Sequence, residues 1–147
     1  MKANRPVATR MLFFAVVMCS TLALTDTASS TEAYFQFKDI DSNTFVFKLV
    51  DASKIKEPRK ILAKKLMIHI MGTLEKSPVT YNKPWHYHLK PETVPFFEVT
   101  TEVCDSTIRF VEGHLSEVGG DFLPENFWCP WSSLLTKEVH LVSKRNK

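Results

Sequence analysis

Histidine and acidic side chains in the middle of the chain have the greatest capacity for chemistry. His86 and His88 are one residue apart, so a strand would direct both side chains to the same face. Two imidazoles and a carboxylate begin many metal sites, and His69 and His114 could approach the pair. The aromatic residues around them instead favour a packed strand. We therefore expect no metal site and no cofactor, with His86 and His88 as weak metal candidates.

Hydrolytic chemistry has less support in the residue pattern. Serine, histidine and aspartate all occur, but the Gly-x-Ser-x-Gly elbow of many hydrolases is absent from the sequence. Glu98 and Glu102 could share one face of a strand, yet nothing pairs them with a leaving-group site as in glycosidases. We expect no enzymatic activity and no catalytic residue.

The first thirty residues have the pattern of a secretory signal peptide. Three basic residues precede an apolar run from Met11 to Leu24, and small residues follow it. The run is shorter than the roughly 20 residues that a membrane-spanning helix needs. We predict that residues 1–30 are a signal peptide cleaved between residues 23 and 30. The protein is then expected to be secreted and extracellular, with no membrane span.

The net charge depends strongly on this leader. The full chain of 147 residues has 19 Lys and Arg against 16 Asp and Glu. Loss of Lys2, Arg5, Arg10 and Asp26 leaves 16 basic and 15 acidic residues, a net charge of +1. So small an excess does not favour nucleic acid as a partner. Any electrostatic function must therefore rest on a local cluster.

Two cysteines remain after the leader, because Cys19 lies within it. Cys104 and Cys129 form an even pair in an exported chain, and such pairs most often form a disulfide. A bridge across this separation would stabilise the fold by about 3–4 kcal/mol in the chain-entropy treatment. Free thiols and metal ligation are the alternatives.

The strongest local charge lies between residues 54 and 65. This segment has six cations and one anion, Glu57. The cations are Lys54, Lys56, Arg59, Lys60, Lys64 and Lys65. The cluster is either a solvated helix face or a patch that attracts a protein or polyanionic partner. Interleaved apolar residues resemble those of calmodulin targets, but Pro58 counts against that interpretation. Calmodulin is therefore expected as a partner only if the protein is intracellular.

A second candidate for binding is the aromatic segment of residues 122–131. It places Trp128 and Trp131 on either side of Cys129. Large aromatics beside a disulfide form either a small core or an exposed recognition loop, since tryptophan is favoured at binding hot spots. Trp128 and Trp131 are therefore candidate anchors.

Hydrophobic periodicity and turn residues indicate the elements that position these groups. We expect a hairpin of residues 33–37 and 44–50, a helix capped by Asp51 or Ser53, strands at 66–71, 85–89, 96–103 and 134–142, and a helix from 105 or 106 to 118 that ends at Gly119-Gly120. Residues 31–142 are thus predicted to form a single α+β domain, a compact and mainly antiparallel sheet with two helices and one disulfide. Residues 143–147 form a basic tail.

Several motifs occur together in a characteristic order. They are Phe45-Val46-Phe47-Lys48-Leu49, Tyr81-Asn82-Lys83-Pro84-Trp85-His86-Tyr87-His88-Leu89, Phe96-Phe97-Glu98, Glu102-Val103-Cys104-Asp105, Phe122-Leu123-Pro124 and Trp128-Cys129-Pro130-Trp131-Ser132-Ser133. From about Tyr34 to Val139, the chain resembles a family of small secreted single-domain proteins labelled calmodulin-binding. The shared unit is similar to the amino-terminal domain of a seventy-four-kilodalton calmodulin-binding protein.

The resemblance implies a compact extracellular domain in which Cys104 and Cys129 belong to the shared pattern. It transfers no functional residues. Pro58 and Lys64-Lys65 depart from the family pattern, and both lie in the segment that would be the calmodulin target.

Taken together, these features predict a secreted, non-enzymatic binding domain. It would recognise a protein or acidic partner through the basic patch and the aromatic loop. The alternatives are an inhibitor of a secreted hydrolase or protease, which would insert residues 80–84 or 124–131, and a structural component of an extracellular matrix.

Overall fold

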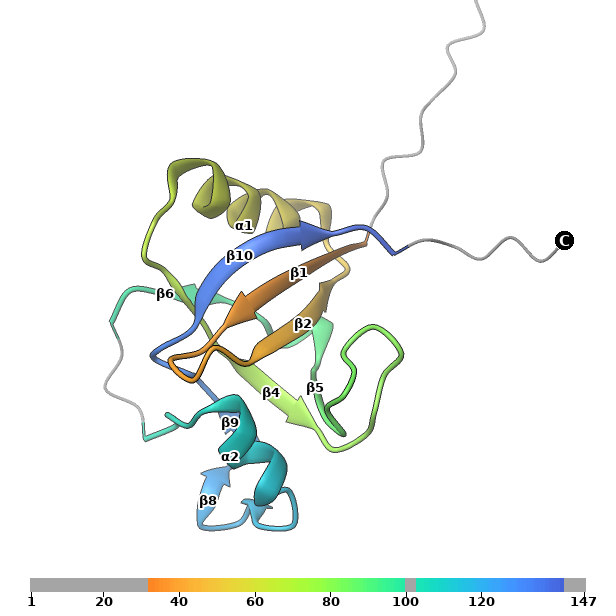
Figure 1. Ribbon diagram of the computed structural model, residues 1–147, viewed down its shortest axis with the longest axis vertical. Helices are drawn as coiled ribbons and strands as arrows, with labels where there is room; N and C mark the ends of the chain where they lie inside the picture. Colours follow the sequence, from red (N-terminus) through yellow and green to blue (C-terminus); the bar gives the residue numbers. More distant parts are fainter. Residues whose placement is uncertain (1–31, 100–102, 142–147) are drawn as a thin grey trace, which may run out of the picture.

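The computed structural model describes residues 32–99 and 103–141 (Figure 1). The predicted signal peptide and basic tail lie outside the described residues. The elements are β1 (Ala33–Lys38), β2 (Thr44–Leu49), α1 (Ala52–Lys64), β3 (His69–Ile70), β4 (Gly72–Glu75), β5 (His88–Leu89), the 3₁₀ turn η1 (Pro91–Thr93), β6 (Phe96–Phe97), α2 (Ile108–Gly113), β7 (Val118–Gly119), β8 (Phe122–Pro124), β9 (Phe127–Trp128) and β10 (Leu134–Val139). The predicted α+β fold with two helices is confirmed.

The largest sheet has the order β10-β1-β2, and all its strands are antiparallel. The hairpin expected from the alternating aromatics forms, with Ala33 opposite Leu49. Its inward face consists of fully buried phenylalanines: Phe35, Phe37, Phe45 and Phe47. Period-two alternation therefore predicted both the strands and the face that they bury.

Smaller sheets complete the core. Their orders are β5-β4-β9, β3-β6 and β7-β8, and of these pairs β7-β8 is parallel while the others are antiparallel. Figure 1 shows α1 at one end of the long axis, beside β10, and α2 with β8 at the other end. The two helices are thus attached to opposite ends of the aromatic core.

Helix α1 begins at the predicted cap. The Asp51 side chain accepts a hydrogen bond from the backbone N of Ser53 at 2.7 Å, which satisfies a free helix donor. Pro58 lies inside the helix without ending it, and its ring is buried together with Ile55 and Ile61. Within the described residues, no helix has the length and apolar content to cross a membrane.

Three predicted strands are shorter than expected. Of 66–71, 85–89 and 96–103, only β3, β5 and β6 are strands among the described residues, and each has two residues. Leu66 and Met67 are exposed in the connection after α1, so their apolar side chains do not define a buried strand. Strand β4 was not predicted.

The second helix also differs from its prediction. It is capped by Thr107, whose side chain accepts from Phe110 N, and it ends at Gly113. Asp105, one of the predicted caps, instead accepts a hydrogen bond from the backbone N of Trp131. Val118 is buried as expected, but it lies in β7 and not in the helix. The prediction is therefore correct for the burial of Val118 and wrong for its local structure.

Candidate binding surface

Two of the six cations in the basic cluster are engaged inside the molecule. Arg59 binds the Glu138 carboxylate with two hydrogen bonds, Nε to Oε2 at 2.9 Å and Nη2 to Oε1 at 2.6 Å. This contact lowers the pKa of Glu138 and raises the pKa of Arg59. Lys54 Nζ donates to the backbone carbonyl of Glu92 at 2.5 Å. Both side chains connect α1 to the rest of the domain.

The other four cations are available on the surface. Lys56, Lys60 and Lys64 are exposed and follow one another at i, i+4 spacing, so they lie along one face of α1. We call these three residues the lysine stripe. None of them forms an ion pair with another described residue. Lys65, also exposed, is the C-cap in the left-handed conformation, with φ of 52°.

The apolar face of α1 is part of the core. Ile55 and Ile61 are 2% and 4% exposed. A partner that grips an amphipathic helix by its apolar face would have to pull α1 away from β10 first. On the folded domain, only the charged face of α1 is accessible.

Trp128 is a core residue, which corrects its prediction as a surface anchor. Its side chain is fully buried, with ring centroids 5.4 Å from Phe45, 5.7 Å from Tyr87 and 5.9 Å from Phe37. The indole Nε1 donates to the carbonyl of Ser106 at 3.0 Å. Burial also raises the pKa of the neighbouring Tyr87 hydroxyl. No part of Trp128 is therefore available to a partner.

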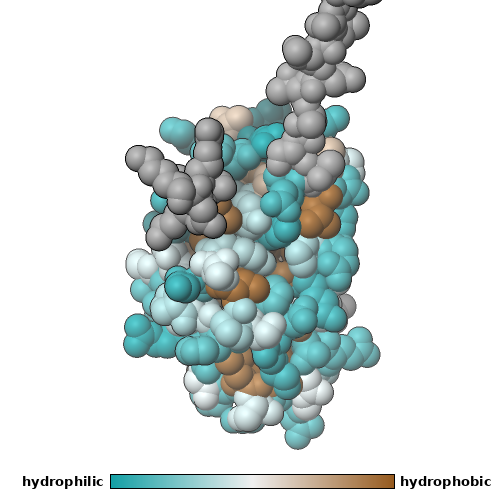
Figure 2. Space-filling model, turned by 90° about the vertical axis from the view of Figure 1, so that its right-hand side faces the viewer, coloured by the Kyte–Doolittle hydropathy of each residue, from teal (hydrophilic) through white to brown (hydrophobic). Residues whose placement is uncertain are grey.

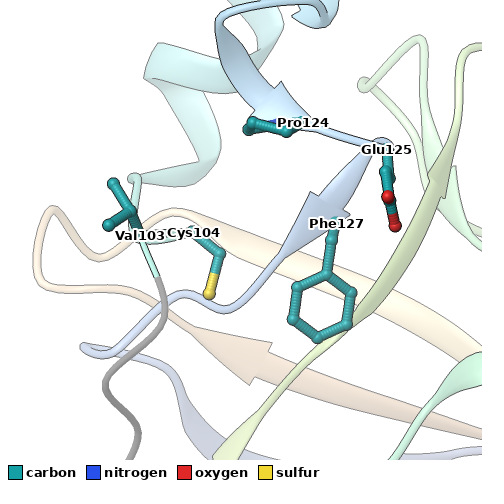
Figure 3. A pocket seen from close by; sticks show the side chains of 5 residues that line it. All are labelled: Val103, Cys104, Pro124, Glu125 and Phe127. Carbon is teal, nitrogen blue, oxygen red and sulfur yellow. The ribbon is translucent and has the colours of Figure 1, made fainter.

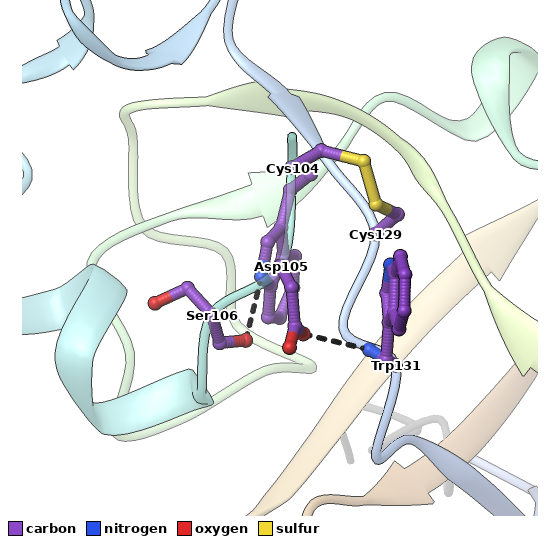
Figure 4. The surroundings of a disulfide bond; sticks show 6 residues. Cys104, Asp105, Ser106, Cys129 and Trp131 are labelled. Carbon is purple, nitrogen blue, oxygen red and sulfur yellow. Dashed lines mark hydrogen bonds between the residues drawn. A yellow bond between two sulfur atoms is a disulfide. The ribbon is translucent and has the colours of Figure 1, made fainter. Parts of the chain in front are cut away.

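Trp131 is exposed just beyond the disulfide. The predicted bridge between Cys104 and Cys129 is confirmed, with a Cα–Cα distance of 5.2 Å. Figure 4 shows the carboxylate of Asp105 directed at the backbone of Trp131, and Asp105 Oδ1 accepts from Trp131 N at 2.8 Å. The indole is 44% exposed. The disulfide and Asp105 thus fix the backbone while the ring remains at the surface.

The structure brings Trp131 close to the end of α1. Trp131 lines a surface hollow of about 350 Å³ together with Ile40 and Met67, and Met67 is two residues beyond Lys65. Ile40 and Met67 are 75% and 73% exposed. Sequence reasoning missed both residues. The only signal for Ile40 was a bulky aliphatic residue within a polar turn, and Met67 fell inside a predicted strand.

The two weak metal candidates do not share a face, contrary to the prediction. His86 lies before β5 and is exposed; its Nδ1 is 2.5 Å from Glu112 Oε1. His88 is buried, and its Nδ1 contacts the carbonyl of Ser77 at 2.8 Å. Across residues 32–99 and 103–141, no group of three or more His, Cys, Asp or Glu is placed to hold a metal ion.

Another hollow, of about 370 Å³, lies beside the disulfide. Figure 3 shows Val103, Cys104, Pro124, Glu125 and Phe127 around it. Among the described residues, Glu125 is the only titratable side chain that lines it, because Cys104 is disulfide-bonded. This described lining therefore has no acid–base pair.

The face on which the loop between β4 and β5 projects is mainly hydrophilic. Figure 2 shows that its hydrophobic side chains form small separate patches. A hollow of about 430 Å³ in this loop is lined by Pro78, Pro84 and Trp85 among others. Trp85 is partly buried, and its Nε1 donates to the carbonyl of Thr44 at 2.7 Å. This loop, which includes the predicted inhibitor segment 80–84, is thus fastened to β2.

A known family model matches most of the chain. This model describes the N-terminal domain of the seventy-four-kilodalton calmodulin-binding protein, and it matches residues 31–142. The match agrees with the resemblance indicated by the tryptophan and cysteine motifs. No curated protein and no solved structure matches the chain.

Proposed function

The chain belongs to the family defined by the N-terminal domain of the seventy-four-kilodalton calmodulin-binding protein. On that premise, we propose that it is a secreted, non-enzymatic binding domain for an acidic protein partner. The lysine stripe and Lys65 attract the partner, and Trp131 contacts it beside the end of α1. The partner binds the folded domain, because Ile55 and Ile61 remain in the core.

The observation that carries this proposal is the arrangement of like charges on α1. Lysines at i, i+4 spacing repel each other and destabilise a helix by about 0.2–0.5 kcal/mol per pair. The helix dipole favours Lys64 in the last turn, but it gives no such support to Lys56 or Lys60 nearer the helix start. An acidic partner would relieve this repulsion, which supports binding as the role of the stripe.

Binding of an acidic polypeptide tests the proposal directly. We would titrate the protein with poly-L-glutamate at about 50 and 300 mM NaCl, where screening of exposed charges differs strongly. Substituting Lys56, Lys60 and Lys64 together by glutamine is expected to weaken binding about tenfold at low salt and to flatten the salt dependence.

The matched control removes the same charge elsewhere. Lys83, Arg109 and Lys137 are exposed and lie outside α1, so their combined substitution by glutamine gives the same net charge. This control is expected to change the affinity less than about threefold. Equal losses in the two triple variants, or binding that does not respond to salt, would overturn the stripe as the binding surface.

Secretion is tested by the intact mass of protein recovered from the culture medium. The expected mass lacks the leader and rises by about two hydrogens on thiol reduction, because the disulfide is then opened. The disulfide and the family match support this part of the proposal. Full-length protein retained in cells with free thiols would overturn it and make calmodulin the first partner to test.

A further inference from the structure

We propose that the hollow beside Trp131 is an anchor site for one large apolar side chain of the acidic partner segment. This inference rests on the proposed function and adds the chemistry of the ligand. Its apolar walls are Ile40, Met67, Trp131 and Leu134, and its charged or titratable edge includes Lys38 and His69. We call it the Trp131 hollow.

The most exposed walls come from three separate segments. Ile40 lies in the β1–β2 turn, Met67 in the connection between α1 and β3, and Trp131 in the connection between β9 and β10. Apolar side chains gathered on a surface commonly mark an interaction site. The volume of about 350 Å³ lies near the lower end of the roughly 300–1,000 Å³ range of ligand pockets. A single anchoring side chain and its immediate neighbours fit such a space.

Hydrogen bonds hold these segments in place before any partner arrives. Asp105 fixes the backbone of Trp131, and Ser132 Oγ accepts from Ile40 N at 3.3 Å. Ser133 Oγ accepts from Ile70 N at 3.1 Å, which connects the same segment to β3. A preformed site loses little conformational entropy on binding. The hollow therefore has the order that a specific anchor site requires.

The charges around the hollow favour an acidic ligand. Asp39 also lines it, but its two oxygens accept backbone hydrogen bonds from Asn43 at 3.0 Å and Ile108 at 2.9 Å. Its carboxylate is thus buried and already occupied within the fold. Lys38 is exposed and has no ion pair with another described residue. The cation is then the charge that a ligand meets at this edge.

His69 adds a second polar contact at the same edge. Its Nδ1 lies 2.8 Å from the carbonyl oxygen of Ser133. Because a carbonyl can only accept, Nδ1 bears the hydrogen and Nε2 has the free lone pair in the neutral ring. Protonation of His69 would add a donor and a positive charge, so neither state introduces an anion. The hollow thus combines apolar walls with an edge suited to carboxylates.

The chain geometry joins the hollow to the lysine stripe. Lys65 N donates to the carbonyl of Leu62 at 3.3 Å, and Leu66 N donates to that of Ile61 at 3.1 Å. These bonds and the left-handed Lys65 end the helix and turn the chain toward Met67. A partner segment with an apolar residue flanked by acidic residues would therefore meet Met67 and the cations of the helix end together.

Two acidic peptides of identical length and charge test the anchor. One has phenylalanine at its centre and the other has serine, and both are titrated calorimetrically. The phenylalanine peptide is expected to bind the native protein about tenfold more tightly, because its ring is removed from water. This ratio should fall below about twofold in Trp131→Ala and in Met67→Ser, and it should persist in Phe110→Ala, which removes an exposed aromatic from α2.

NMR identifies the site, because the three tryptophans are in different environments. The indole N–H groups of Trp85 and Trp128 are hydrogen-bonded to backbone carbonyls, so their signals should not move. The indole signal of Trp131 should shift with the phenylalanine peptide more than with the serine peptide. An unchanged Trp128 signal in each variant also shows that the core is intact.

The outcomes separate this inference from the proposed function. Equal, salt-sensitive binding of the two peptides would overturn the anchor site and leave the lysine stripe as the binding surface. An advantage of phenylalanine that survives both Trp131→Ala and Met67→Ser would also overturn the anchor site. Binding of neither peptide would overturn both proposals. With the stripe lysines replaced by glutamine, both peptides should weaken equally while their ratio stays near tenfold.

Discussion

Trp128 and Trp131 are three residues apart and have opposite environments. Trp128 is fully buried among aromatic rings, and its indole N–H is bonded to Ser106. Trp131 is 44% exposed beside Met67, and no described residue accepts a hydrogen bond from its indole N–H. One residue type thus serves the core on one side of Cys129 and the surface on the other. The contrast shows that the partners of the polar atoms, more than the residue type, distinguish structure from function here.

Truncating each tryptophan gives the largest expected difference between these regions. Trp128→Ala should lower the free energy of unfolding by about 3–5 kcal/mol, because it leaves a cavity in the core. Trp131→Ala should change it by less than about 0.5 kcal/mol, since the ring is at the surface. Urea denaturation of both variants measures the difference. Similar losses would show that Trp131 is also a structural residue.

A buried amide extends the comparison to polar groups of the core. Asn82 is 1% exposed; its Oδ1 accepts from Val46 N at 2.7 Å and its Nδ2 donates to Tyr87 O at 3.1 Å. Asn82→Ala would leave two buried backbone groups without partners, at a cost of about 2 kcal/mol. The adjacent, exposed Lys83→Ala should change the free energy of unfolding by less than about 0.5 kcal/mol. Equal urea midpoints for these two variants would contradict the bridging role of Asn82.

The sequence was informative where one local pattern governed the structure. Alternating phenylalanines predicted the β1–β2 hairpin, and Asp51 predicted the start of α1, because both signals act over a few residues. The disulfide followed from the pairing of two cysteines. These features therefore did not require knowledge of the tertiary fold.

The candidate site was predictable only in part, because it depends on distant segments. The sequence indicated the basic helix, but not that Arg59 would be bound to Glu138 while the lysine stripe remained without ion pairs to described residues. It also did not place Ile40 beside Trp131, since these residues come from opposite ends of the domain. Asp105 was expected to cap α2, but it binds Trp131. Long-range contacts decided each of these outcomes.

The Arg59–Glu138 pair tests the engaged part of the basic cluster by its pH dependence. The contact lowers the pKa of Glu138 below its ordinary value of 4.5, so the folded state favours the charged carboxylate. The pair should therefore stabilise the fold above about pH 4.5, and this contribution should disappear as the pH falls through the lowered pKa. Because Arg59 is about half exposed, we expect only about 0.5 kcal/mol near pH 7.

Comparing native protein with Glu138→Gln measures that contribution. The difference in the free energy of unfolding should be largest near neutral pH and should approach zero at about pH 2.5. High salt should reduce it, since both side chains are partly in contact with solvent. A difference that stays constant from about pH 7 to about pH 2.5 would show that the charge of Glu138 is not its source.

The smallest expected effect has the opposite sign and concerns Lys60. Lys60 belongs to both repulsive pairs of the lysine stripe, with Lys56 and with Lys64. Lys60→Gln should therefore raise the free energy of unfolding by about 0.5 kcal/mol at low salt, and the gain should vanish at about 1 M NaCl.

Lys83→Gln is the control for the Lys60 measurement, because it removes an exposed cation from a loop and leaves α1 intact. Loss of stability in Lys60→Gln at low salt would mean that Lys60 supports the fold, which would remove the main argument for the stripe as a binding surface. A gain in stability together with weaker poly-L-glutamate binding would instead show that the helix retains a charge that costs stability and serves recognition. Trp128 and Lys60 would then mark the two extremes of the molecule, one residue that the fold requires and one that it only tolerates.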